Sequence, residues 1–124
     1  MLRALLIDDE AHFRDTMRKL LERHCPHVSV EGEAVSVSEG IGAIRTLKPD
    51  LVFLDINMKD GTGFDLLQSL GPPDFRIILI SAFDKNTLME VKRSGMLFLT
   101  KPINPIELIA AVNHAENAGS HNFL

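Results

Sequence analysis

Five short runs of apolar residues, each about as long as a β-strand, alternate along the chain with segments in which apolar residues recur at helical spacing. The runs cover residues 2–7, 27–34, 51–55, 75–80 and 96–100. Four of them are almost continuously apolar, which is typical of parallel strands buried on both faces of a sheet. The run at 27–34 alternates apolar and polar residues, so we expect an edge strand with one face in water.

The segments between the runs carry helix signals, and residues 59–63 are expected to form a loop. Helices are predicted over residues 11–24, 37–47, 62–70, 85–94 and 104–117. Ser36 with Glu39 forms a capping-box pattern before the second helix, and Thr62 with Asp65 forms a similar one before the third. Leu88 and Val91 are expected to be the main anchors of the fourth helix, and Asn104 followed by Pro105 marks the start of the fifth. Because strand and helix alternate five times, we predict an α/β protein with a flavodoxin-like, doubly wound (βα)5 sandwich. The five-stranded parallel sheet is expected in the order 2-1-3-4-5, with the polar second strand at an edge.

Polar residues stand where four of these strands end. The first strand is followed by Asp8 and Asp9, and the third ends at Asp55. The fourth is followed by Ser81 and the fifth by Lys101. The carboxyl ends of parallel strands share one edge of the sheet, and ligands bind there at the point where strand order reverses. We therefore expect the three acids to meet between the first and third strands.

Three carboxylates within about 5 Å repel one another, at roughly 3 kcal/mol for each close pair when the effective dielectric constant is about 20. Lys101 supplies one compensating charge, and a divalent cation supplies two. Mg²⁺ prefers oxygen ligands and needs only one or two carboxylates when phosphate oxygens complete its shell. The acids therefore predict Mg²⁺, or alternatively Mn²⁺, together with a phosphoryl group. The backbone carbonyl of Asn57 is a further candidate ligand.

The same residues suit transfer of a phosphoryl group to a carboxylate. A carboxylate that attacks phosphorus forms an acyl phosphate, and the protein then supplies mainly charge neutralisation and positioning. Asp55 is the candidate acceptor, and the Ser81 hydroxyl and the Ala82 backbone N–H are candidates for holding a phosphoryl oxygen. Each residue alone has a simpler interpretation, such as a helix cap, a loop acid or a surface lysine. Their joint occurrence at the ends of four strands favours the functional interpretation.

Composition and charge narrow the class of protein. The chain has 124 residues, of which 45% are hydrophobic, and this suits one domain. We expect the domain over residues 1–118 and a frayed tail, or the start of a linker, at 119–124. No apolar run approaches a membrane span and Cys25 has no disulfide partner, so a cytoplasmic protein without membrane contact is expected. The net charge of −4 argues against direct nucleic-acid contact by this domain.

Taken together, these motifs resemble the receiver domain of two-component response regulators. The matching pieces are LLIDDE at 5–10, DINM at 55–58, Gly63, Ser81 with Ala82, and FLTKP at 98–102. The resemblance extends over residues 2 to about 117 and is spread across four strands in order. It implies the fold predicted above and a regulatory protein that catalyses only its own phosphorylation and dephosphorylation.

The resemblance also implies a role for each matching residue. Asp55 matches the phosphoacceptor. Asp8 and Asp9 match the acidic pair that binds Mg²⁺ together with Asp55 and the Asn57 carbonyl. Lys101 matches the lysine that contacts the phosphoryl group. A sensor histidine kinase or a phosphotransfer protein is the implied donor.

A switch is implied as well. Ser81 matches the hydroxyl residue drawn toward the phosphoryl group, and Phe98 matches the aromatic residue that turns in response. The face formed by the fourth helix, fifth strand and fifth helix would then change, and would bind a partner or a second copy of the chain. The Lys101–Pro102 peptide bond is expected to be cis in this family.

The chain departs from the family at Lys59, where a proline is usual, so the loop is expected to be freer and to carry a cation near the site. Asn57 and Phe83 flank the expected entry of hydrolytic water, and the bulk of Phe83 predicts slow loss of the phosphoryl group. The SAFD sequence at 81–84 is similar to that of receivers attached to LytTR-type DNA-binding domains. No output domain is expected within these residues, so the chain is predicted to be a single-domain regulator or an excised module.

Two other interpretations remain open. One is a Mg²⁺-dependent phosphohydrolase with Asp55 as the nucleophile. Such enzymes commonly carry a second acid two residues later, where this chain has Asn57, which cannot act as a general acid. The other is an interaction module that works without phosphorylation, and such a module needs none of the acids.

Overall fold

The structure, a computed structural model, describes residues 1–82 and 84–118. Its main sheet has five parallel strands in the order β2-β1-β3-β6-β7. The elements are β1 (Leu2–Ile7), α1 (Ala11–His24), β2 (Val28–Ala34), α2 (Val37–Leu47), β3 (Leu51–Asp55), β4 (Asn57–Met58), β5 (Gly61–Thr62), α3 (Gly63–Leu70), β6 (Arg76–Ser81), α4 (Lys85–Ser94), β7 (Phe98–Thr100) and α5 (Pro105–Ala118). Without the two-residue strands β4 and β5, the order is 2-1-3-4-5, and the predicted fold is confirmed.

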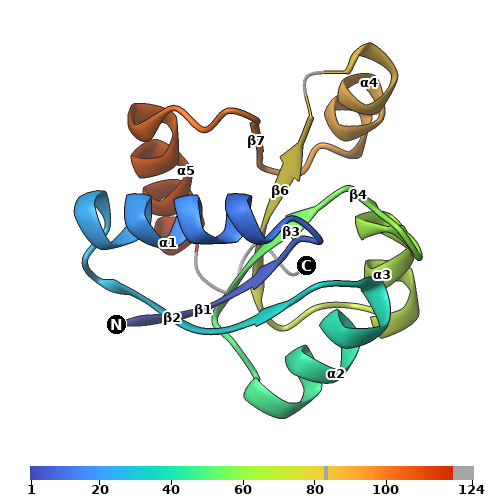
Figure 1. Ribbon diagram of the computed structural model, residues 1–124, viewed down its shortest axis with the longest axis horizontal. Coiled ribbons are helices and arrows are strands. Elements are labelled where there is room, and N and C mark those ends of the chain that lie inside the picture. The colour runs from blue at the N-terminus through green and yellow to red at the C-terminus, as the bar shows by residue number, and fades with distance from the viewer. Residues whose placement is uncertain (83, 119–124) are drawn as a thin grey trace.

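Helices cover both faces of the sheet, with α1 and α5 on one face and α2 and α3 on the other (Figure 1). Strand side chains alternate between the two layers, as the two-residue period of a strand requires. In β3, Leu51 and Phe53 pack with the α1 and α5 layer, whereas Val52 and Leu54 pack with the α2 and α3 layer. All five residues of β3 are buried, which explains why its sequence is apolar without interruption up to Asp55.

The element boundaries differ from the predictions mainly at strand ends. β2 begins at Val28, β6 begins at Arg76, and β7 begins only at Phe98. The last difference arises because the pairing of β6 with β7 starts at Leu79 opposite Phe98, and Leu97 contributes only its carbonyl, which accepts from the Leu79 N–H at 2.9 Å. The start of α5 is as predicted, because the Asn104 side chain accepts backbone hydrogen bonds from the first turn.

The two capping boxes differ in how completely they form. Thr62 and Asp65 bond reciprocally at the start of α3. At α2, the Ser36 hydroxyl accepts from the Glu39 N–H at 3.0 Å, but the Glu39 carboxylate reaches the Val35 N–H instead of returning to Ser36. The sequence pattern therefore located both helix starts but described only one of the two caps fully.

The face of α4 that meets the sheet was predicted incorrectly in one position. Leu88 and Val91 were expected to anchor this helix. Val91 is fully buried, but Leu88 is only partly buried, and Thr87 is the second buried residue of α4. The buried hydroxyl of Thr87 has two hydrogen-bond partners, which makes its burial possible.

The segment expected as a loop at 59–63 contains half of a short hairpin. β4 and β5 pair antiparallel, with Asn57 opposite Thr62. Asp60, in the turn between them, accepts hydrogen bonds from the Val37 and Ser38 amides at 2.8 and 3.2 Å. These donors lower the pKa of the Asp60 carboxyl. Lys59 stands where the family usually has a proline, but two contacts constrain this loop. They are the pairing of β4 with β5 and the hydrogen bonds from the start of α2 to Asp60.

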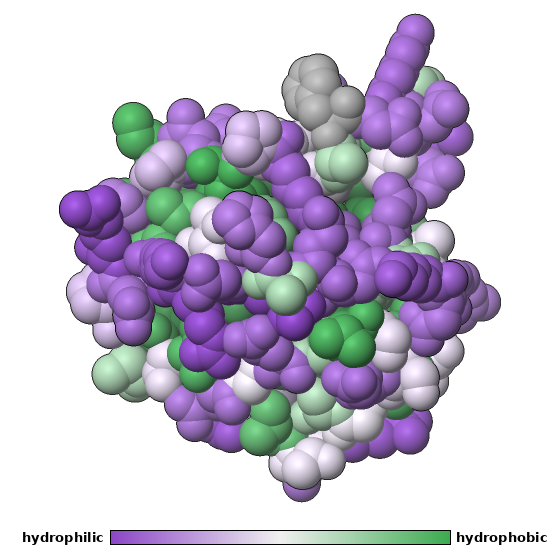
Figure 2. Space-filling model, in the orientation of Figure 1, coloured by the Kyte–Doolittle hydropathy of each residue, from purple (hydrophilic) through white to green (hydrophobic). Residues whose placement is uncertain are grey.

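Hydrophilic residues cover much of the face shown in Figure 2. Among the described residues, the large apolar side chains that are exposed are far apart in the sequence and are Met1, Val35, Met89 and Ile106. Among the described helices, none is both long enough and apolar enough to cross a membrane. The chemistry that distinguishes the molecule is instead the acidic group at the carboxyl edge of the sheet.

Candidate phosphoryl-transfer site

The register of the central strands brings the three predicted acids together. β1 pairs with β3 so that Ile7 lies opposite Leu54, and the next residues of the two strands are Asp8 and Asp55. One carboxylate oxygen from each of Asp8, Asp9 and Asp55 lies within 4.8 Å of the other two. Asp8 and Asp55 are only 3% and 4% exposed. The expected meeting of the acids between the first and third strands is therefore present.

Lys101 reaches the same acids from the end of β7. Its Nζ lies 2.9 Å from Asp8 Oδ2 and 3.6 Å from Asp55 Oδ2. Two contacts were missed by sequence reasoning: Nζ also lies 2.9 Å from Glu10 Oε1 and 4.3 Å from the centre of the Phe13 ring. Glu10 directly follows the acidic pair, which was the available signal for it. Phe13 has the helical spacing of an ordinary core residue and offered none.

The electrostatics of the site centre on Asp55. Burial and the neighbouring charge of Asp8 raise the pKa of Asp55 from its usual value of 3.8 to about 7, with a smaller contribution from Asp9. The Lys101 ammonium and the Asn57 backbone N–H act in the opposite direction. A carboxyl with this pKa holds its negative charge weakly, and an added positive charge would favour the ionised form.

The charge of Lys101 is well maintained. Burial disfavours the ammonium, but hydrogen bonding and charge from Glu10, Asp8 and Asp55 outweigh it and raise the pKa of Lys101. The same contact with Lys101 lowers the pKa of the Glu10 carboxyl. One ammonium contacts three carboxyl groups and Asp9 adds a fourth to the cluster, so carboxyl groups outnumber cations at the site.

The residues present fit a hard divalent cation. Asp8 Oδ2 is buried, and its close contact within the described part of the chain is the Lys101 ammonium at 2.9 Å. The group supplies carboxylate oxygens within 4.8 Å of one another, and oxygen is the donor type that Mg²⁺ and Mn²⁺ prefer. Asp8, Asp9 and Asp55 would hold such an ion.

The other predicted phosphoryl-site residues adjoin the acids. The Asn57 N–H donates to Asp55 Oδ1 at 3.4 Å. Ser81 is fully buried at the end of β6, and its hydroxyl donates to the Ala82 carbonyl at 2.9 Å. The Lys101 N–H donates to the Ser81 carbonyl at 2.9 Å, so the ends of β6 and β7 are joined here. Ala82 is exposed, which leaves space for a donor molecule.

The remaining predicted residues have varied positions. Phe98 is partly buried and packs against the α2 and α3 core layer. Lys59 is exposed, and within the described ranges no ion pair joins it to the acids. The Lys101–Pro102 peptide bond is cis, as expected. Phe83, expected to limit water entry, lies outside the described residues, as does the expected tail at 119–124.

Gly63 leaves room for the backbone of Asp55. A Cβ at this position would lie 2.8 Å from the Asp55 carbonyl oxygen and 3.1 Å from Leu54 Cγ. A backbone atom cannot move aside as easily as a flexible side chain. Close approach of α3 to the end of β3 therefore requires glycine here.

We expect Gly63→Ala to lower the free energy of unfolding by about 1–3 kcal/mol, because the new methyl group overpacks this contact. Gly42→Ala is the matched control, since a Cβ there would meet nothing within 4 Å. Alanine within α2 should raise stability by up to about 1 kcal/mol. Urea denaturation of the three proteins measures both effects. Equal stability of Gly63→Ala and the wild type would contradict the close-contact argument.

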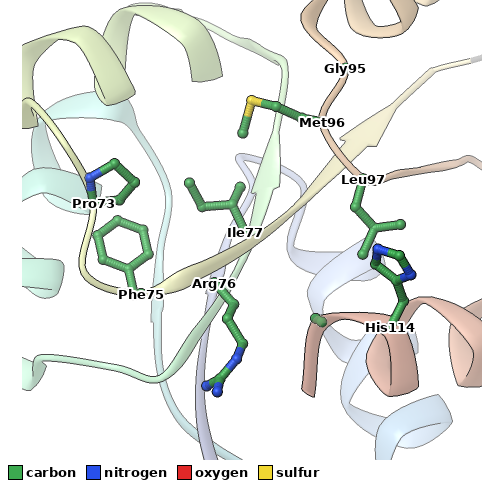
Figure 3. A pocket seen from close by; sticks show the side chains of 9 residues that line it. Pro73, Phe75, Arg76, Ile77, Gly95, Met96, Leu97 and His114 are labelled. Carbon is green, nitrogen blue, oxygen red and sulfur yellow. The ribbon is translucent and has the colours of Figure 1, made fainter. Parts of the chain in front are cut away.

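A separate cavity of about 290 Å³ lies near the amino-terminal ends of β6 and β7 (Figure 3). It is lined by Pro73, Phe75, Arg76, Ile77, Gly95, Met96, Leu97, His114 and Ala115. No lining residue is acidic, so the cavity offers no carboxylate to a metal ion. The candidate chemistry therefore belongs to the opposite edge of the sheet.

Comparison with known proteins agrees with this geometry. The family model of the response regulator receiver domain matches residues 4–113. A response regulatory protein of Vibrio vulnificus is 34% identical over 125 residues, which covers 100% of this chain and 51% of the relative. The sensory transduction protein LytT of Bacillus anthracis is 33% identical over 113 residues, covering 88% and 45%. The response regulator domain of Thermotoga maritima CheB superposes with a TM-score of 0.76 at 26% identity, covering 94% and 97%. The chain spans about half the length of these curated relatives.

Proposed function

The chain belongs to the response regulator receiver family, and from this premise we propose that it accepts a phosphoryl group on Asp55 and so controls a partner or an output domain. Receiver domains of this family are regulatory modules of two-component signalling. The observation that best supports the proposal is the group of three acids within 4.8 Å, with the Lys101 ammonium 3.6 Å from Asp55. A structural acid cap would need neither the cluster nor the lysine.

The proposed reaction is a displacement at phosphorus. A carboxylate oxygen of Asp55 forms a bond to phosphorus while the bond between phosphorus and the imidazole nitrogen of a donor phosphohistidine breaks. The electron pair of the broken bond remains on the imidazole, and Asp55 becomes an acyl phosphate. The reacting carboxylate must be ionised, and Lys101 and the Asn57 N–H both favour that form.

Mg²⁺ held by Asp8, Asp9, Asp55 and the Asn57 carbonyl would neutralise charge on the transferred phosphoryl oxygens. Lys101 would exchange part of its contact with Asp8 and Glu10 for a phosphoryl oxygen. Ala82 would donate its backbone N–H to another of these oxygens.

The proposed response begins at Ser81. Its hydroxyl now donates to the Ala82 carbonyl, and rotation about one side-chain bond would redirect it to the phosphoryl group. Phe98, which is only partly buried, would then turn toward the space that Ser81 leaves. This would change the face of α4, β7 and α5, which we propose binds a partner or a second copy of the chain.

The proposed donor is a sensor histidine kinase or a phosphotransfer protein. We propose that residues 1–118 are the receiver unit and that 119–124 are a tail or the start of a linker. Because the chain spans about half the length of its relatives, we infer that phosphorylation of Asp55 acts on a further domain or on a separate partner protein. A LytTR-type output domain would agree with the similarity to LytT.

Intact-mass spectrometry during incubation with acetyl phosphate and increasing Mg²⁺ separates the three interpretations. We expect one phosphoryl group to be added per chain when Mg²⁺ is present. No phosphoryl group should be added when EDTA is present before the donor. Catalytic turnover of a small phosphate ester without a stable adduct would favour the phosphohydrolase. No adduct at any Mg²⁺ concentration would favour the phosphorylation-independent module and contradict the proposal.

A further inference from the structure

Three polar side chains join the loop after Asp55 to the first turn of α4. Asn57 Nδ2 donates to Thr87 Oγ1 at 3.3 Å, and the Thr87 hydroxyl donates to Asp84 Oδ2 at 2.9 Å. Thr87 is 8% exposed, whereas Asn57 and Asp84 lie at the surface. We call this arrangement the Asn57–Thr87–Asp84 chain.

The direction of these hydrogen bonds is determined by the hydroxyl. Thr87 has one hydroxyl proton and gives it to Asp84, so its oxygen can only accept from Asn57. Asp84 is itself fixed, because its other oxygen accepts the Asn86 N–H at the start of α4. An amide suits position 57 since it brings a donor, and a carboxylate there would face the lone pairs of the hydroxyl.

Asn57 connects this chain to the candidate metal site. Its side chain contacts α4 through Thr87, while its backbone N–H donates to the Asp55 carboxylate. Its backbone carbonyl is the proposed further metal ligand. A shift of Asn57 would therefore alter both its contact with Thr87 and its contact with the Asp55 carboxylate.

The attachment of α4 to the rest of the fold makes this contact significant. Only Thr87 and Val91 are buried among the residues of α4. Val91 lies in the second turn of the helix, so Thr87 is the buried contact of the first turn. Loss of one hydrogen bond should therefore loosen the first turn of α4 more than it would loosen a helix with many buried residues.

We propose that Thr87 is a positioning residue that couples cation binding at the Asn57 loop to the order of the first turn of α4. This inference rests on the proposed function, because it requires a cation at the acids. Coupling between two binding or ordering events is reciprocal, so a cation that orders α4 is itself bound more tightly when the contact with α4 is intact. Neither Ser81 nor Phe98 belongs to this connection, so it acts beside the proposed phosphoryl switch.

Thr87→Val and Thr87→Ser test the proposal as a matched pair. Valine keeps the shape of threonine and lacks the hydroxyl, whereas serine keeps the hydroxyl and lacks the methyl group. Hydrogen exchange of peptides from Lys85–Ser94 would be measured with and without Mg²⁺, and Mg²⁺ affinity would be measured by calorimetry. In the wild type we expect Mg²⁺ to slow exchange in the first turn. Thr87→Val should lose this effect and bind Mg²⁺ about three- to tenfold more weakly, as expected for one hydrogen bond.

Thr87→Ser should behave like the wild type in both measurements, and thermal unfolding would establish that both variants are folded. Equal Mg²⁺ affinity and equal exchange in Thr87→Val and the wild type would overturn the inference alone. The inference would also be overturned if Thr87→Ser lost Mg²⁺ affinity and the effect of Mg²⁺ on exchange to the same extent as Thr87→Val. Packing of the methyl group would then be responsible. Absence of Mg²⁺ binding in the wild type would overturn the proposed function as well, so the two failures can be told apart.

Discussion

Replacing Asp55 with Asn is expected to reduce phosphoryl transfer from acetyl phosphate to the background seen without protein. The amide has no anionic oxygen to attack phosphorus, and its neutral oxygen is a poor nucleophile. The substitution preserves the shape of a residue that is only 4% exposed, so the fold should be retained. Intact mass and peptide mapping after reaction with saturating Mg²⁺ would measure the result.

Two control variants make this result specific. Asp9→Asn removes a proposed metal ligand and leaves the acceptor in place, so it should still be labelled, but only at higher Mg²⁺ concentrations. Asp74→Asn changes an exposed carboxylate just before β6, outside the acidic group, and should match the wild type. Labelling of Asp55→Asn at the wild-type level would show that another residue accepts the phosphoryl group, and the proposed function would fail at its central residue.

The arrangement of the acids was predictable because it follows from strand direction alone. Asp8 and Asp55 each follow a continuous apolar run, and the ends of neighbouring parallel strands must lie side by side. The edge position of β2 was predictable for a similar reason, since its alternating pattern is typical of a strand with one face in water. Each of these inferences needed the type and spacing of residues within a single element.

The parts that were missed depend on contacts between distant segments. Lys101 meets Glu10 across 91 positions of sequence, and no local pattern marks that pairing. The pairing of Asn57 with Thr62 is too short to produce a recognisable strand pattern. Thr87 was passed over because hydropathy favours burial of the neighbouring leucine, whereas burial of the threonine depends on two hydrogen bonds from other positions.

The stability of the metal-free protein is expected to fall as the pH rises from about 5 to about 8. Asp55 has a folded-state pKa of about 7 against a usual value of 3.8, so the folded state binds this proton more tightly than the unfolded state does. Its stabilising effect is complete below the unfolded pKa and is lost as pH rises through the folded pKa. We expect a loss of about 1–3 kcal/mol, less than the full shift implies, because this pH range begins above the unfolded pKa.

Carboxyl groups with a lowered pKa do not contribute to the change in the free energy of unfolding over this pH range. Those of Glu10, Glu33 and Asp60 contribute stability that is present above their usual pKa values near 4 and is lost only in more acidic solution. The five histidines are present in both the wild type and Asp55→Asn, so any contribution from them cancels in the comparison. The difference between the two proteins therefore isolates Asp55.

Urea denaturation at pH 5.5 and pH 8 in EDTA would give the four free energies of unfolding. Asp55→Asn should lose most of the pH dependence and should be the more stable protein at pH 8. Saturating Mg²⁺ should stabilise the wild type at pH 8 more than at pH 5.5, because ligand binding to the folded state requires the ionised acids. Equal pH dependence of the two proteins would mean that burial and the neighbouring acids do not raise the pKa of Asp55 in solution. The physical reason for recruiting a cation to this edge of the sheet would then be lost, even if Asp55 still accepted a phosphoryl group.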